Sequence, residues 1–192
     1  MAEPRWKPVT AWEGIAAPGL FGRVDGAPGV IIELGGHVGM ASVSAPAAAL
    51  GAHYGLALTE APRAYKIGDM TLIWTAPAQW LATSDDRSLA DRLGAALSGV
   101  AAVADQSDAR AVVRLSGPKA RDVLAKGCLV DLHPRAFGPG QVAMTVFGHI
   151  NVMLRQIDER PTFEIALFRS MAESFWHWLG AAAGEFGADI RG

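Results

Sequence analysis

Cys128 is the only cysteine of the chain, and His133 follows it five residues later with Asp131 between them. A thiol beside an imidazole forms a nucleophile pair in some hydrolases, provided that a third group orients the base. Here His133 precedes Pro134 in a stretch of loop-like composition, and the spacing is not diagnostic of such a pair. We therefore do not expect a cysteine hydrolase site.

Metal binding is the second chemistry to consider, because the chain has five histidines. They are His37, His53, His133, His149 and His177. Structural zinc sites use pairs of ligands at short spacings, and the sequence contains neither Cys-x-x-Cys nor His-x-x-x-His. We expect these histidines to be polar surface or core residues, and we assign no metal-binding residue.

Asp105 and Asp108 are the first and last residues of the tetrapeptide DQSD, just before a strand-like run. Two neighbouring carboxylates can act as general acid and base. At a junction between a loop and a strand, however, an aspartate more often closes an Asx-turn by accepting a backbone N–H two residues later. We expect the Asx-turn, and we assign no catalytic residue.

The segment SGPK, Ser116 to Lys119, joins a strand-like run to a helical pattern. A phosphate-binding loop of the G-x-x-x-x-G-K-[ST] type needs a second glycine, and Pro118 lacks a backbone N–H. The start of a helix with Lys119 could still attract an anion. We expect a strand-to-helix turn instead, with Ser116 or Gly117 as the cap and Pro118 as the first helical residue.

The glycine-rich stretch GGHVGM at residues 35–40 follows a strand but opens no helix, and no G-x-G-x-x-G motif is present. We expect a hairpin turn at Gly35-Gly36 between strands over 30–34 and 38–43. The sequence therefore assigns no cofactor-binding residue either.

Composition indicates a cytoplasmic globular protein. The 192 residues are 51% hydrophobic and 19% charged, with a net charge of −2. No basic block is present to neutralise phosphates, so we expect neither nucleic acid nor a membrane as a partner. With one cysteine no internal disulfide can form, which favours the cytoplasm. We expect no signal peptide, and the longest small-apolar run, residues 93–104, is shorter than a membrane span.

Hydrophobic periodicity predicts an ordered series of strands and helices. Further strands are expected over 70–74, 79–83, 111–115, 141–147, 150–156 and 162–168, and helices over about 46–54, 87–100, 118–126 and 170–186. Ser170 and Glu173 have the spacing of a capping box at the start of the last helix.

The two halves of the chain repeat this order. VSAP at 43–46 matches LSGP at 115–118, Gly68-Asp69 matches Gly148-His149, and RSLADRL from Arg87 matches RSMAESF from Arg169. We predict an α+β fold of two pseudo-repeated strand–helix–strand–strand–helix units, about 30–103 and 104–188, within a single domain 30–188. The units would form a mostly antiparallel sheet with helices on one side.

Residues 1–29 are predicted to form an extended N-terminal arm, because prolines and glycines recur along them. The arm carries Trp6 and Trp12, which could pack on their own domain or anchor a partner. On the last helix, Trp176 lies about 100° from the centre of the apolar face. We expect truncation of Trp176 to weaken assembly more than folding.

The segment ADQSDARAVVRLSGPKARDVLAKGCLVDLHPRAF at 104–137 resembles the folate-binding fold of glycine-cleavage aminomethyltransferases. Together with TVFGHINVMLRQID and PTFEIALFRSMAESFWHWL it is similar to the gamma subunits of heterotetrameric sarcosine oxidases. Aminomethyltransferases often have histidine where this chain has Asp108, so no ligand residue is transferred from that family. The full transferase also has a C-terminal domain for which this sequence has no counterpart.

The resemblance implies a non-catalytic structural subunit that assembles with alpha, beta and delta subunits. Such enzymes oxidise sarcosine to glycine, hydrogen peroxide and formaldehyde or methylene-tetrahydrofolate. FAD, FMN, NAD, zinc and tetrahydrofolate would belong to the partner subunits and none to this chain. Two alternatives remain at this point: a stand-alone folate-binding or aminomethyltransferase-like protein, and the gamma subunit of a related N-methyl amine oxidase.

Overall fold

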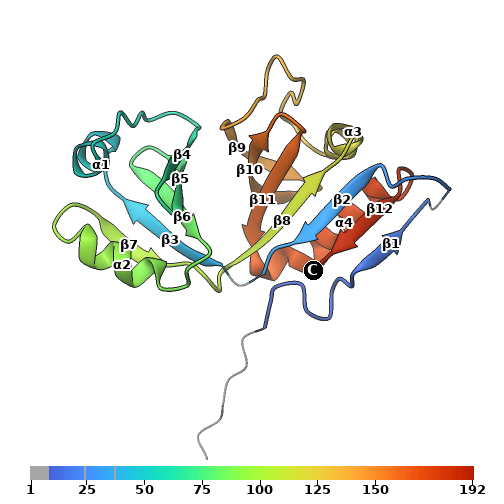
Figure 1. The fold of residues 1–192 in the computed structure, drawn as a ribbon, viewed down its shortest axis with the longest axis horizontal. Coiled ribbons are helices and arrows are strands. Elements are labelled where there is room, and N and C mark those ends of the chain that lie inside the picture. Colours follow the sequence, from blue (N-terminus) through green and yellow to red (C-terminus); the bar gives the residue numbers. More distant parts are fainter. Residues whose placement is uncertain (1–8, 24, 37) are drawn as a thin grey trace, which may run out of the picture.

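The computed structural model describes residues 9–23, 25–36 and 38–192, which form two α+β halves lying side by side (Figure 1). The elements follow the order β1 (Gly19–Phe21), β2 (Val30–Leu34), β3 (Gly39–Ser44), α1 (Ala47–Tyr54), β4 (Ala64–Ile67), β5 (Met70–Ala76), β6 (Gln79–Ser84), α2 (Leu89–Ala96), β7 (Ala102–Asp105), β8 (Arg110–Ser116), α3 (Ala120–Ala125), β9 (Val142–Phe147), β10 (Ile150–Asp158), β11 (Thr162–Phe168), the 3-10 turn η1 (Arg169–Met171), α4 (Ala172–Ala183) and β12 (Ala188–Arg191). Among the described residues, no helix has the length and apolar character needed to cross a bilayer.

The strands form two sheets, one in each half of the molecule. The seven-stranded sheet has the order β1-β12-β2-β8-β11-β10-β9, and the five-stranded sheet has the order β4-β5-β6-β3-β7. Neighbouring strands are antiparallel except for β12 with β2. Helices α3 and α4 pack on one face of the larger sheet, and α1 and α2 pack on one face of the smaller sheet. The predicted α+β class is confirmed.

The pseudo-repeat is visible in the strand order. The series β4-β5-β6-β3-β7 corresponds to β9-β10-β11-β8-β2, with every neighbouring pair antiparallel. Ser44 and Ser116 end the matched strands β3 and β8. Gly68 and Gly148 open the matched β4–β5 and β9–β10 turns with φ of 58° and 51°. The short strands β1, β4, β7 and β12 were not predicted from the sequence.

The predicted hairpin at Gly35-Gly36 is wrong, because β2 and β3 belong to different sheets. This stretch carries the chain from one half to the other. The Gly35 N–H donates to the Val112 carbonyl at 2.9 Å, and a Cβ on Gly35 would lie 2.6 Å from that oxygen. The glycine is thus needed for a close approach to β8 and not for a tight turn.

The described residues form three apolar clusters, one inside each half and one between the halves. One lies between the larger sheet and helices α3 and α4, and a second lies between the smaller sheet and helices α1 and α2. The third is smaller and joins the inner faces of the two sheets, with Met40, Ile73 and Leu81 on one side and Val112 and Met153 on the other. The sheets therefore pack face to face only where this apolar cluster continues.

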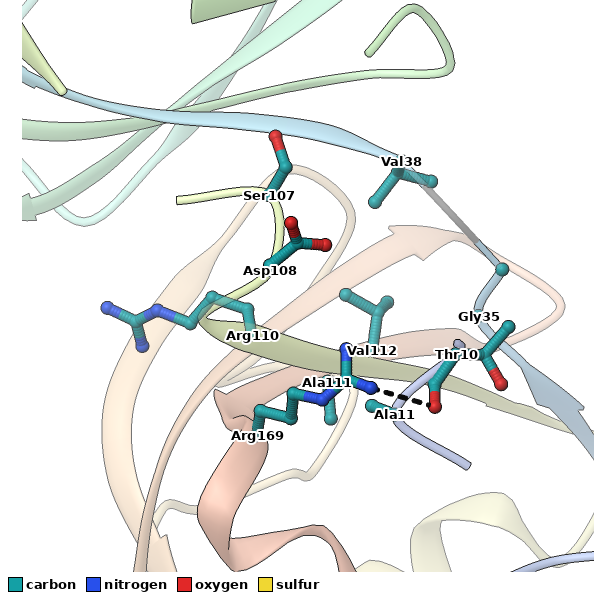
Figure 2. Close-up of a pocket in the computed structure, with 11 residues that line it drawn as sticks. Thr10, Ala11, Gly35, Val38, Ser107, Asp108, Arg110, Ala111, Val112 and Arg169 are labelled. Carbon is teal, nitrogen blue, oxygen red and sulfur yellow. Dashed lines mark hydrogen bonds between the residues drawn. The ribbon is translucent and has the colours of Figure 1, made fainter. Parts of the chain in front are cut away.

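The N-terminal arm packs on the junction between the halves. Trp12 is 2% exposed, and its indole N–H donates to the Val112 carbonyl at 2.7 Å. Arg169 donates to the carbonyls of Val9 and Thr10, and Figure 2 shows its guanidinium directed at Thr10. Of the two alternatives for Trp12, the structure has the one in which it packs on its own domain; Trp6 lies outside the described residues. The half-buried Trp176 packs against Trp12 with a tilted ring, at 6.2 Å between ring centres, and its predicted role in assembly stays a prediction.

Candidate functional site

A groove of about 860 Å³ opens between the inner faces of the two sheets. It begins where the apolar cluster between the sheets ends. On β8, β11 and β10 the inward-facing residues change within two positions from Val112, Ala166 and Met153 to charged residues. On the opposite side, Thr71 and Thr83 of the smaller sheet line the groove. This groove, with its charged floor, is the candidate binding site.

The floor of the groove is a row of five alternating charges. Neighbouring strands β12, β2, β8, β11 and β10 place Arg191, Glu33, Arg114, Glu164 and Arg155 in register across the larger sheet. Opposite charges on adjacent strands stabilise a sheet, whereas like charges destabilise it. The order + − + − + therefore places each carboxylate between two guanidinium groups.

Glu164 is the buried centre of this row. Its carboxylate accepts from Arg155 at 2.6 Å and from Arg114 at 2.9 Å, and its side chain is 6% exposed. Burial acts to raise the pKa of Glu164, but the charges and hydrogen bonds of Arg155 and Arg114 outweigh burial and leave the pKa below its ordinary value. The carboxylate is thus held ionised, which makes it a poor general acid.

The opposite rim of the groove is also internally paired. Asp69 accepts from Arg92 at 2.6 Å and from Ser84 at 3.0 Å, and the Arg92 bond is the main reason that its pKa is lowered. Lys66 donates to the Asp69 carbonyl. The groove therefore combines the size of a ligand site with charged groups that already neutralise one another.

The Cys128, His133 and Asp131 set does not form a catalytic arrangement. The Cys128 sulfur accepts the Val130 N–H at 3.4 Å, and burial raises the pKa of its thiol. The Asp131 carboxylate accepts the His133 backbone N–H, while the His133 imidazole Nδ1 accepts the Arg135 backbone N–H. These three side chains serve the local loop, and the thiol has no activating partner among these contacts.

The histidines are scattered over the fold. His53 stacks edge-on against its neighbour Tyr54 on α1, His149 occupies the β9–β10 turn with φ of 72°, and His177 is exposed on α4. His37 lies outside the described residues. Within the described ranges, no three histidine, cysteine, aspartate or glutamate side chains come together as a metal site.

Asp105 and Asp108 have separate structural roles. Asp105 accepts both the backbone N–H and the hydroxyl of Ser107, and these bonds are the main reason that its pKa is lowered. This is the Asx-turn expected from the sequence. Asp108 pairs with Arg87 at 2.9 Å.

The SGPK segment is a strand-to-helix turn. Gly117 has φ of 108°, and a Cβ there would meet the Gly29 carbonyl at 2.8 Å. Lys119 pairs with Asp122 at 2.9 Å and is the N-cap of α3, so the helix begins two residues later than predicted. Neither this helix nor α4 has a side-chain cap, so the predicted capping box at Ser170 and Glu173 is absent.

Sequence reasoning missed two structural carboxylates. Glu60 accepts the backbone N–H groups of Ala47 and Ala78 and the indole N–H of Trp74, and these backbone bonds lower its pKa. It lies in an irregular loop, where no pattern marks it. Glu164 interrupts the apolar strand TFEIALF, which was a usable signal of a paired charge.

Comparison with known proteins gives a family. A sequence model described as "Sarcosine oxidase, gamma subunit family" matches residues 38–185. The chain is 39% identical over 117 residues to a sarcosine oxidase subunit gamma of Arthrobacter sp, covering 60% of this chain and 57% of that protein. A Corynebacterium sp. (strain P-1) subunit gamma is 38% identical over 62% of this chain and 59% of its own. The alignments thus span less than two thirds of these relatives.

Solved structures agree in fold. A chain of heterotetrameric sarcosine oxidase from Corynebacterium sp. U-96, solved with pyrrole 2-carboxylate, matches with a TM-score of 0.73 and 30% identity over 82% of this chain and 85% of that chain. The glycine cleavage system aminomethyltransferase T from Bartonella henselae matches with a TM-score of 0.64 and 17% identity, over 86% of this chain and 48% of the transferase. The second match supports the folate-binding-like fold alone.

Proposed function

The chain belongs to the sarcosine oxidase gamma subunit family, and we propose that it is a non-catalytic structural subunit of a flavin-dependent heterotetrameric sarcosine oxidase. In this proposal it assembles in the cytoplasm with alpha, beta and delta subunits. The assembly oxidises sarcosine to glycine, hydrogen peroxide and formaldehyde or methylene-tetrahydrofolate. FAD, FMN, NAD, zinc and tetrahydrofolate are bound by the partner subunits.

One observation supports the proposal that this chain supplies no catalytic residue. The groove has the size of a ligand site, yet its central carboxylate, Glu164, lies between Arg114 and Arg155. A catalytic carboxyl needs a pKa near the working pH, and the two arginines move the pKa of Glu164 the other way. This arrangement supports a structural role for the row of charges.

The test is purification of the tagged chain from its native host, followed by intact masses and visible absorbance. The proposal expects co-purifying alpha, beta and delta chains and the absorbance of bound flavin. A colourless single chain at the end of the purification would contradict it. Purification with a different amine oxidase would favour the related N-methyl amine enzyme.

The groove itself favours a second candidate, a stand-alone folate-binding protein. Its volume of about 860 Å³ lies within the range of small-molecule sites. Because none of the described residues that line the groove is a tryptophan, tryptophan fluorescence is a poor reporter of binding there. Calorimetric titration with tetrahydrofolate is the suitable test, and the absence of heat at millimolar ligand would exclude this candidate.

A further inference from the structure

Arg110 and Phe168 form a cation–aromatic pair at the surface of the larger sheet. They are opposite each other on β8 and β11, and the guanidinium carbon lies 4.2 Å from the centre of the Phe168 ring. Figure 2 shows the Arg110 guanidinium extending away from the other labelled side chains of the junction. Stacking on the ring fixes the plane of the guanidinium before any ligand arrives.

Arg110 differs from the arginines of the groove floor. Arg114, Arg155 and Arg191 each pair with a carboxylate. In the described part of the chain, Arg110 has no acidic partner, and its Nε is buried without a hydrogen-bond acceptor. A buried donor left without a partner costs free energy, and burial lowers the pKa of the guanidinium.

Three exposed apolar side chains belong to Phe168 itself and to the segments that Arg169 connects to it. Phe168 is 49% exposed, Met171 on η1 is 43% exposed, and Val9 of the arm is 42% exposed. Arg169 connects the arm to this strand end, since it follows Phe168 in sequence and donates to the Val9 carbonyl at 2.7 Å. Arg110, Phe168, Met171 and Val9 are called here the Arg110 patch.

We propose that the Arg110 patch docks a partner subunit of the oxidase through a segment that presents a carboxylate flanked by apolar side chains. A carboxylate would give the Arg110 guanidinium the acidic partner that it lacks among the described residues, and Arg–carboxylate pairing is strong and directional. Aromatic residues, Met and Arg are enriched at interface cores. One cation without a basic cluster is a poor match for a membrane surface. The inference rests on the proposed function.

Hydroxyl-radical footprinting of the wild-type chain tests the proposal directly. The isolated full chain and the purified oxidase complex are oxidised in parallel, and modification of Met171 and Phe168 is read by mass spectrometry. We expect at least fivefold protection of both residues in the complex. Met144, which is 50% exposed on the outer strand β9, serves as the matched methionine in a different part of the sheet.

A charge reversal gives a second, independent measurement. Arg110→Glu should weaken association with the partner subunits on the order of 30-fold or more, since it places a like charge against the carboxylate. Arg160→Glu is the control, because Arg160 is exposed in the β10–β11 turn and should leave association unchanged. The melting temperature of each isolated variant separates docking from folding.

The outcomes distinguish the inference from the function on which it rests. Protection of Met171 and Phe168 together with weakened association of Arg110→Glu supports the patch. A complex in which both residues stay as reactive as in the isolated chain overturns the patch and leaves the function intact. Protection that appears in the isolated chain as its concentration rises indicates a second copy and also overturns it. If no complex forms at all, both the proposed function and the role of the Arg110 patch are overturned.

Discussion

At the scale of single residues, charged groups of this chain act mainly by fixing strands and loops. Glu164 holds two arginines of neighbouring strands, and Glu60 accepts three donors from α1 and the β5–β6 region. Glu164 could have been found from the sequence, since a charge inside an apolar strand calls for a partner. Its partners could not, because register between strands is a tertiary property.

Glu164→Gln should lower the free energy of unfolding by roughly 3 kcal/mol, the low end of the range for breaking a buried pair. The low end applies because Arg114 is 47% exposed and therefore partly solvated. Urea denaturation measures the loss. Glu185→Gln is the control, because the exposed Glu185–Lys126 pair should contribute under about 1 kcal/mol. Equal effects of the two substitutions would contradict the structural role of Glu164.

The same carboxylate predicts a pH dependence. The pKa of Glu164 is lower in the folded chain than in the unfolded chain, where it is about 4.3. Its contribution to stability is therefore present above the unfolded pKa and is lost as pH falls through the folded pKa. Denaturation midpoints measured downward from pH 6 should fall less steeply in Glu164→Gln than in the wild type. Parallel curves would exclude this linkage.

At the scale of elements, two glycines allow the end of α3 and the β9–β10 turn to lie close to a tryptophan side chain of α4. Gly127 follows α3 and Gly148 lies in the β9–β10 turn, and a Cβ on either would come within 2.8 Å of the Trp178 indole. Trp178 packs against Phe147 with a tilted ring, at 5.0 Å between ring centres, and so joins α4 to the sheet. The sequence predicted that the helix ends near Gly127, because glycine commonly follows the last turn of a helix. It could not reveal the indole, which comes from a distant part of the chain.

Gly127→Ala should destabilise the fold by about 1–3 kcal/mol, because the added methyl group overpacks against Trp178. Gly94→Ala is the matched substitution, since Gly94 lies inside α2 and a Cβ added there would meet no atom within 4 Å. There alanine should stabilise the helix by up to about 1 kcal/mol. Thermal denaturation should thus give shifts of opposite sign, and shifts of the same sign would contradict the packing argument.

At the scale of the whole molecule, two similar units are joined by chain crossings and by an apolar cluster between their sheets, and the N-terminal arm packs on the larger unit. The order of elements in the two units was predictable, because matching segments recur in the same order along both halves of the sequence. The crossing at Gly35 was not, because a glycine pair after a strand has the same local signature in a hairpin. The packing of Trp12 was left open for a similar reason, since an indole in an irregular segment suits a core or an interface.

Trp12→Ala should cost about 3–5 kcal/mol of stability, because it removes a buried indole from the apolar core of the larger half. Trp12→Phe keeps most of the apolar area but loses the hydrogen bond to the Val112 carbonyl. The loss of this bond should lower the free energy of unfolding by about 1 kcal/mol, in addition to any loss of packing. Trp176→Ala should also lower stability, because Trp176 packs on Trp12. Melting temperatures of the isolated variants check this order, and an unchanged value for Trp12→Ala would show that the arm is dispensable.

The central claim is that this chain is an oxidase subunit without catalytic residues. The most direct measurement is sarcosine-dependent peroxide formation per bound flavin, made on complexes purified through a tag on this chain. The wild type is compared with the double variant Cys128→Ala, His133→Ala, which removes the chain's cysteine and its neighbouring histidine. We predict an active flavin-containing complex in both cases, with turnover equal within twofold. A complex that keeps its flavin but loses turnover by more than 100-fold would place chemistry in this chain and contradict the account.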